Sequence, residues 1–327
     1  MVPINYQARK KTRELEIVKM VYPDAEKYIK SIDQEQPDFL VAGLQKKVVF
    51  GVEVTELYQN ESSARLKHIP GYVDALVERR EYQHKDDVNK LKPDEFEILD
   101  EAGNVKHTLK GVMQTLPSLT EYLRLLEETI TEKTKKLSQY APEAQYHVLL
   151  IYDMEAFFGG VPLTDLYAAM FSPEIEQVLD RSRFREIYLV GQMDQQDRYI
   201  PLKSYQLYAA LQQFEQFFLP TCTDGISVRK YIETTIAVLA QTGFGNACIH
   251  QAENFISLSY GDLSMKIDLV DQSGSVFFPT QYLDYSDGSK AAAFAASYPV
   301  DQTVVEGFRQ YRTNYSFHST FAFPWSK

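Results

Sequence analysis

Hydrophobic and small or polar residues alternate most clearly between positions 48 and 57, and this pattern predicts a β-strand. Side chains alternate between the two faces of a strand. One face of the predicted strand is apolar and consists of Val48, Phe50, Val52 and Val54. Glu53 points to the opposite face. A carboxylate in so apolar a strand is costly unless something compensates it, so we expect Glu53 to have a specific partner.

A second apolar run covers residues 39–42 and begins directly after Asp38. If the two runs pair as a hairpin through residues 43–47, Asp38 and Glu53 meet near one end of it. Two adjacent carboxylates repel each other unless a cation or a shared proton intervenes. Mg²⁺ and related ions prefer such hard oxygen ligands. In the alternative interpretation, Asp38 caps a strand and Glu53 pairs with a lysine, and these two residues alone do not decide.

The same patterns predict the rest of the chain as a mixture of helices and strands. Helices are expected over residues 8–22, 25–32, 118–140, 164–179, 204–218 and 227–242, with a polar helical stretch over 58–89 that breaks at Pro70-Gly71. Further strands are expected over residues 95–100, 105–110, 146–152, 186–190, 247–250, 255–260 and 265–270. The strand over 146–152 is apolar on both faces, which is typical of a sheet covered on both sides. The fold class is therefore α/β.

Two of the predicted helices carry charged residues at or beside their apolar faces. Glu14 borders the buried face of the first helix, and the basic residues of its first turn are expected to be solvated; they are Arg9, Lys10, Lys11 and Arg13. Lys133 is the only charge in the apolar stripe of the helix over 118–140. A lysine there needs a carboxylate partner or an exit to water. We infer that Lys133 reaches Glu53, either as a catalytic group or as a structural ion pair.

Composition narrows the possible classes of protein. The net charge of −11 is evidence against a protein that coats nucleic acid non-specifically, although a locally favourable site remains compatible with it. The two cysteines form neither a disulfide framework nor a zinc motif, which suits a reducing cytoplasm, and no membrane span or signal peptide is expected. The six histidines form no metal motif, and neither a phosphate-binding glycine loop nor a nucleophile elbow is present.

Pro37-Asp38, followed after fourteen residues by Glu53-Val54-Thr55, resembles the active-site motif of the PD-(D/E)XK nuclease superfamily. The resemblance covers roughly the first 200 residues and rests on few positions. Thr55 stands where the family usually has lysine. Some branches supply that lysine from another element, and Lys133 is the better candidate here, with Lys67 as another. The long helical stretch after the Glu53 strand also departs from the family order.

The resemblance implies a restriction-endonuclease-like mixed central sheet flanked by helices over residues 1–222, with an insertion at about 59–111. It further implies an endonuclease that hydrolyses nucleic-acid phosphodiesters, DNA rather than RNA, in a bacterial antiviral defence setting. Mg²⁺ or Mn²⁺ would be held by Asp38, Glu53 and the carbonyl of Val54, with Glu14 assisting, and Lys133 would complete the catalytic set. In this resemblance the basic residues of the first helix would face a phosphate backbone instead of being solvated.

Residues 223–327 are predicted to form a smaller α+β domain. Its sequence indicates no specific role, and it could bind DNA, a protein partner or a second copy of the chain. Two other classes of function stay open. Thr55 and the acidic net charge favour a non-catalytic binding or assembly protein that keeps a degenerate nuclease fold. The chain has 22 Tyr and 19 Phe, and its aromatic C-terminal region is compatible with a structural protein that forms oligomers.

Overall fold

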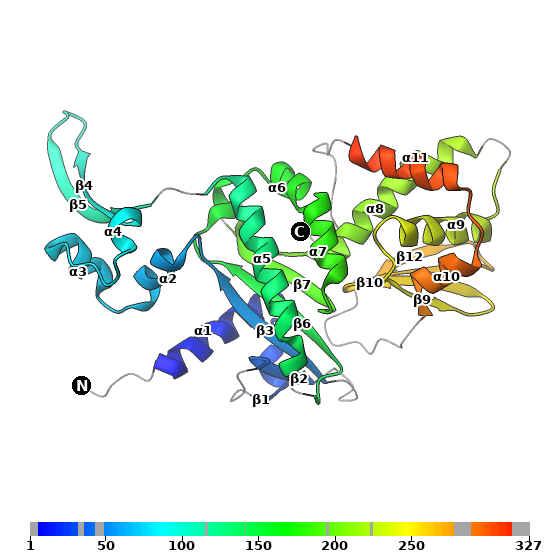
Figure 1. Ribbon diagram of the computed structural model, residues 1–327, viewed down its shortest axis with the longest axis horizontal. Helices are drawn as coiled ribbons and strands as arrows, with labels where there is room; N and C mark the ends of the chain where they lie inside the picture. Colours follow the sequence, from blue (N-terminus) through cyan, green and yellow to red (C-terminus); the bar gives the residue numbers. More distant parts are fainter. Residues whose placement is uncertain are drawn as a thin grey trace. The chain divides into compact units, whose positions relative to one another are not determined.

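A computed structural model describes residues 6–31, 36–42, 49–114, 117–140, 142–193, 196–222, 225–277 and 289–315. The chain divides into two compact units (Figure 1). Residues Met1–Glu56 and Leu126–Lys327 form the larger unit, and residues Leu57–Leu125 form the smaller one, which contains the segment expected as an insertion. No helix in the described parts of the chain is both long enough and apolar enough to cross a membrane.

The larger unit is built on a six-stranded sheet of order β1-β2-β3-β6-β7-β8. Its strands are β1 (Ile29–Ser31), β2 (Phe39–Ala42), β3 (Val49–Leu57), β6 (Tyr146–Asp153), β7 (Glu186–Met193) and β8 (Gln196–Pro201). β1, β2 and β3 pair antiparallel, β6 and β7 pair parallel, and β8 returns antiparallel to β7. The predicted α/β class with a mixed sheet is therefore confirmed.

Helices α1 (Tyr6–Val21) and α5 (Leu119–Lys136) lie on opposite faces of this sheet. The apolar face of β3, with Phe50, Val52 and Val54, packs in one core with residues of α1 such as Val18. Glu53 points the other way and contacts the last turn of α5. Because neighbouring side chains on a strand point to opposite faces, the two helices sandwich β3.

The prediction of a helix over residues 25–32 is wrong for its second half. Only Ala25–Lys27 forms a helical turn, of the 3₁₀ type, and Ile29 enters strand β1, where it pairs with Val41. The backbone N–H of Ala42 also donates to the carbonyl of Tyr28. These hydrogen bonds to β2 outweigh the local helical preference, because pairing with a distant strand is invisible to local periodicity.

The single helix expected over residues 164–179 is two helices, α6 (Leu163–Met170) and α7 (Pro173–Arg181). Pro173 has no N–H for an intrahelical hydrogen bond and favours the first helical position. The hydroxyl of Ser172 accepts a hydrogen bond from the N–H of Ile175 and caps the new helix. The chain therefore restarts its helix at Ser172-Pro173.

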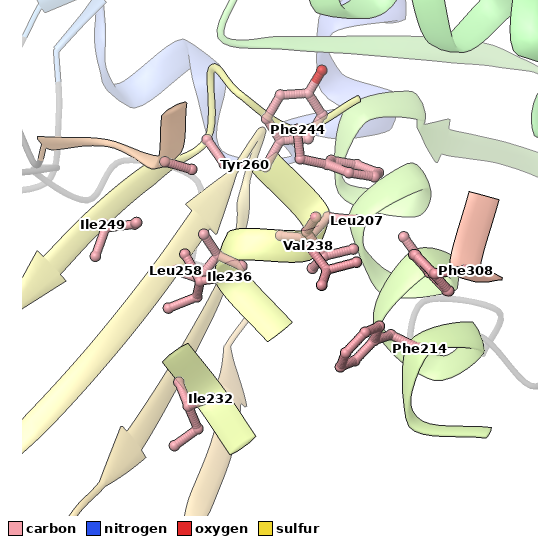
Figure 2. Packing of buried hydrophobic residues seen from close by; sticks show 14 of the residues in the cluster. Leu207, Phe214, Ile232, Ile236, Val238, Phe244, Ile249, Leu258, Tyr260 and Phe308 are labelled. Carbon is pink, nitrogen blue, oxygen red and sulfur yellow. The ribbon is translucent and has the colours of Figure 1, made fainter. Parts of the chain in front are cut away.

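The C-terminal part of the larger unit places helices against a second, antiparallel sheet of order β12-β11-β10-β9-β13. Its strands are β9 (Cys248–Gln251), β10 (Phe255–Tyr260), β11 (Leu263–Asp268), β12 (Gly274–Phe277) and β13 (Ser289–Lys290), and its helices are α8 (Leu202–Phe218), α9 (Val228–Gln241), α10 (Ala291–Ser297) and α11 (Gln302–Thr313). Figure 2 shows Phe214 of α8, Ile236 of α9 and Leu258 of β10 in its core. Helix α8, predicted to close the first domain, thus belongs to this core.

Glu186 joins β7, α8 and the β10–β11 turn through hydrogen bonds. Its fully buried carboxylate accepts from the backbone N–H groups of Lys203 at 2.9 Å, Ser204 at 3.1 Å and Asp262 at 3.0 Å. Gly261 has φ +63°, and a Cβ there would lie 2.2 Å from Glu186 Oε2. The turn therefore needs glycine both for its conformation and for the approach of this carboxylate.

The smaller unit contains helices α2 (Glu61–His68), α3 (Tyr72–Arg79) and α4 (Asp87–Lys90) and a hairpin of β4 (Lys92–Leu99) and β5 (Val105–Met113). Asp87 is its buried polar centre. Its Oδ1 accepts from Arg65 Nη2 at 2.6 Å and its Oδ2 from the hydroxyl of Tyr72 at 2.5 Å. Burial acts to raise the pKa of Asp87, but the hydrogen bonds from Arg65 and Tyr72 outweigh it and lower this pKa to about 2.

We expect Asp87→Asn to destabilise α3 by about 2 kcal/mol at pH 7, because a pKa lowered to about 2 stabilises the folded state by roughly that amount. A carboxylate whose folded-state pKa is depressed contributes above its unfolded pKa, near pH 4, and the contribution is lost as pH falls through about 2. Hydrogen exchange of residues 72–79 measures the opening free energy. The matched control is Asp86→Asn, whose exposed side chain pairs with His84. Equal loss of protection in both variants would contradict this assignment.

Candidate metal centre

The pairing of β2 with β3 brings Asp38 beside Glu53. Phe39 pairs with Val52, so Asp38 lies at the same end of the strand pair as Glu53. Asp38 Oδ2 accepts a hydrogen bond from the backbone N–H of Val54 at 2.9 Å, which fixes the carboxylate against β3. The turn expected to join the two strands, residues 43–47, lies outside the described residues, as does Val48. The register nevertheless places both carboxylates as the hydrophobic pattern predicts.

Lys133 contacts Glu53 in the structure. Its Nζ donates to Glu53 Oε1 at 2.6 Å, and both side chains are largely buried, with 19% and 7% of their surface exposed. The second oxygen, Glu53 Oε2, is buried and accepts no geometrically regular hydrogen bond within the described residues. The inferred contact is therefore present, whereas the catalytic role of Lys133 stays a prediction.

Glu14 reaches the same cluster from α1. Its carboxylate is buried, and Lys11, one turn earlier on the helix, lies between it and Asp38. Lys11 Nζ is 3.0 Å from Glu14 Oε2 and 3.0 Å from Asp38 Oδ1. Lys10 Nζ approaches Glu14 Oε1 at 3.4 Å from an exposed position. One ammonium group thus bridges two of the acidic side chains.

Burial and mutual repulsion shift the pKa values of these groups. Burial raises the pKa of Glu53, the charge of Asp38 raises it further, and Lys133 and the nearby Tyr140 hydroxyl act against both. Burial and the charge of Asp38 likewise raise the pKa of Glu14, against the effect of Lys11. Burial acts to lower the pKa of Lys11, but the Asp38 and Glu14 carboxylates outweigh it and raise this pKa. Negative charge in this cluster is therefore unfavourable, and a further positive charge would stabilise it.

The donor set of this cluster suits a hard divalent cation. Asp38 and Glu53 supply carboxylate oxygens, which are the ligands that such cations prefer, and Glu53 Oε2 is buried. Among the described residues, however, no group of three or more His, Cys, Asp or Glu side chains already converges as a metal site. Lys11 instead lies between Glu14 and Asp38 and contacts both carboxylates.

The other basic residues singled out in the sequence have different surroundings. Arg9 is exposed, and Arg13 pairs with Glu56, its Nε 2.8 Å from the carboxylate. Lys67, the second candidate for the missing lysine, is exposed in the smaller unit. Thr55 is partly buried on the Glu53 face of β3. Lys133 is thus the lysine that the structure brings to Glu53.

Sequence reasoning missed two members of the site. Lys11 was grouped with the phosphate-facing or solvated basic residues, although its position three residues before Glu14 is a recognised spacing for a helical ion pair. Tyr140 was counted only as an apolar stripe residue, yet its hydroxyl interacts with Glu53, and burial followed by that charge raises the pKa of Tyr140. The phenol therefore remains protonated and able to donate.

No protein-family model, curated protein or solved structure matches this chain. The resemblance to PD-(D/E)XK nucleases accordingly rests on the motif residues themselves. Function has to be argued from the chemistry of Glu14, Asp38, Glu53 and Lys133.

Proposed function

We propose that this chain is a metal-dependent endonuclease that hydrolyses DNA phosphodiester bonds. The observation that carries the proposal is the pair of carboxylates at one end of β2 and β3, with the ammonium group of Lys133 2.6 Å from Glu53. Acidic oxygens for a cation next to a lysine are the parts that phosphodiester hydrolysis needs, since charge must be neutralised on the phosphate and a water must be activated.

Asp38 and Glu53 hold Mg²⁺ or Mn²⁺ in this proposal, together with the backbone carbonyl of Val54. The ion, when bound, lowers the pKa of water and neutralises charge on the phosphate. The hydrogen bond from the Val54 N–H keeps Asp38 oriented toward the site. Glu14 assists from α1 by bringing a further carboxylate beside Asp38; burial and the charge of Asp38 raise the pKa of Glu14, so the two groups lie close enough to interact.

In this proposal, Lys133 performs the function of the motif lysine, whose position in the sequence is occupied by Thr55. Its ammonium group either positions the attacking water or stabilises the negative charge that develops on the pentacovalent phosphorus. Support comes from its placement: it emerges from the α5 face of the sheet, the same face to which Glu53 points. A lysine from a helix can therefore act at the position that a lysine at residue 55 would serve.

The remaining parts of the proposal follow the motif resemblance. The larger unit would have the restriction-endonuclease-like arrangement, the protein would work in the cytoplasm in bacterial defence, and the C-terminal part would contact DNA, a protein partner or a second copy. The mixed sheet with helices on both sides of β3 is compatible with that arrangement. Each of these points is separable from the chemistry of the site.

The proposal predicts that purified protein nicks or cleaves plasmid DNA with Mg²⁺ or Mn²⁺ and that a chelator stops the reaction. Supercoiled, nicked and linear plasmid are separated on a gel after incubation with each ion and with the ion plus chelator. Asp38→Asn protein, purified in the same way, is the control for contaminating nucleases. Cleavage that persists in the chelator, or equally in Asp38→Asn, would refute the proposed site.

A second candidate function is a DNA-binding protein without cleavage. The observation that favours it is that Lys11 and Lys133 already pair with the carboxylates, so the cluster is partly neutralised without a metal. Such a protein would shift DNA in a gel without changing plasmid topology in any divalent ion. Plasmid cleavage that depends on Glu53 would exclude it.

A further inference from the structure

Lys11 lies where a cation ligated by the acidic cluster would be expected. Its ammonium group contacts three oxygens, namely Glu14 Oε2 at 3.0 Å, Asp38 Oδ1 at 3.0 Å and the carbonyl oxygen of Asp38 at 3.3 Å. Carboxylate and carbonyl oxygens are the ligands that hard divalent cations prefer. Lys11 therefore occupies the carboxylate of Asp38, a proposed metal ligand, and that of Glu14, which assists it.

The charge of the cluster favours the release of one lysine when a divalent cation binds. Glu14, Asp38 and Glu53 carry three negative charges when ionised, and Lys11 and Lys133 already balance two of them. A divalent ion added to this set would make it positive. Lys133 contacts Glu53 through Oε1, whereas Lys11 contacts both Asp38 and Glu14. Lys11 is thus the lysine that a bound metal ion would displace.

We propose that Lys11 is an internal cation that competes with the metal: it holds Asp38 and Glu14 together in the metal-free protein and is displaced when the metal binds. This inference rests on the proposed function. The lysine side chain is flexible, and Lys11 keeps 20% of its side-chain surface exposed, which gives it a route to water. Lys11 thereby weakens metal binding and keeps the site closed until the ion is abundant.

The test is a titration with Mn²⁺ alone, in which electron paramagnetic resonance measures the free ion in the presence of the full chain. We expect Lys11→Met to bind Mn²⁺ about tenfold more tightly than the wild type, since a partly buried charge-assisted contact no longer competes. Lys10→Met is the matched control, because Lys10 is the neighbouring lysine, is exposed and lies 3.4 Å from Glu14 Oε1. Its affinity should stay within about twofold of the wild type.

The outcomes separate this inference from the proposed function. If the wild type binds Mn²⁺ and Lys11→Met binds it equally or more weakly, Lys11 does not compete and the inference fails, while the metal centre stands. If neither protein binds Mn²⁺, the metal centre and the inference fail together. Tighter binding by Lys11→Met supports the metal centre and the inference, whereas DNA cleavage is tested separately by the plasmid assay.

A second measurement uses the wild-type protein and does not depend on how a variant folds. An acylating reagent modifies accessible lysine amines, and mass spectrometry quantifies the modification of Lys11 and Lys10 separately. We expect Mg²⁺ or Mn²⁺ to speed the acylation of Lys11 several-fold and to leave the exposed Lys10 nearly unchanged, because only Lys11 leaves a buried contact. Unchanged or slower acylation of Lys11 at saturating metal would overturn the inference.

Discussion

Replacing Glu53 by glutamine is expected to lower metal-dependent DNA cleavage by on the order of a thousandfold or more. Glutamine keeps the size of the side chain but removes the negative charge that attracts the cation. Glu53 is also the acidic partner of Lys133, whose Nζ lies 2.6 Å away, so the variant loses the anchor of that ammonium group as well. Plasmid cleavage rates at saturating Mg²⁺ and Mn²⁺, with Mn²⁺ affinity measured separately, check this expectation.

Glu56→Gln is the matched control for this change. Glu56 lies on the same strand three residues later and pairs with Arg13 rather than with Lys133. Its replacement should leave the cleavage rate within about threefold, since surface-type ion pairs contribute little. Glu53→Gln protein that is folded and cleaves DNA at the wild-type rate would rule out the proposed site.

Lys133→Met is expected to lower the cleavage rate by about a hundredfold to a thousandfold, the usual cost of removing one group that stabilises a developing charge. Methionine retains the length and apolar stem of lysine, which suits the partly buried position on α5. Mn²⁺ affinity should not fall, because the variant leaves the Glu53 carboxylate in place. Rate and affinity are thereby separated, which a purely structural ion pair would not predict.

Lys136→Met serves as the control on the same helix, since Lys136 is exposed and lies at the edge of the apolar stripe. If Lys133→Met only lowers the unfolding temperature and retains its cleavage rate, the contact between Lys133 and Glu53 is a structural ion pair. Lys133→Arg then offers a further check, because a retained cation in altered geometry should rescue stability better than catalysis.

Local hydrophobic patterns were sufficient to predict the carboxylate arrangement. The alternation along β3 fixed which side chains share a face, and it put Glu53 opposite the face that packs on α1. The position of Lys133 within an apolar helical stripe implied a buried partner, and the contact with Glu53 is present. Both inferences rest on the same reason: a buried charge needs an opposite charge nearby, and Glu53 and Lys133 are charged residues within apolar segments.

Long-range contacts of residues that lie outside an apolar stripe or strand were not predictable in the same way. Lys11 bridges Asp38 across 27 positions of sequence, so its local pattern as one of several helical basic residues was uninformative. Helix α8 was expected to end the first domain, yet Phe214 packs in the C-terminal core with Phe308. The carboxylate of Glu186 is likewise engaged by backbone groups that follow it by as many as 76 positions. Such contacts require the tertiary fold.

The most direct test of the account is a crystal of the wild-type protein soaked in Mn²⁺, with the ion located by its anomalous scattering. The account predicts a peak bonded to Asp38, Glu53 and the carbonyl of Val54, with Lys133 still at Glu53 and Lys11 turned away from Asp38. A fully occupied Mn²⁺ elsewhere, with Lys11 still bridging Asp38 and Glu14, would contradict it.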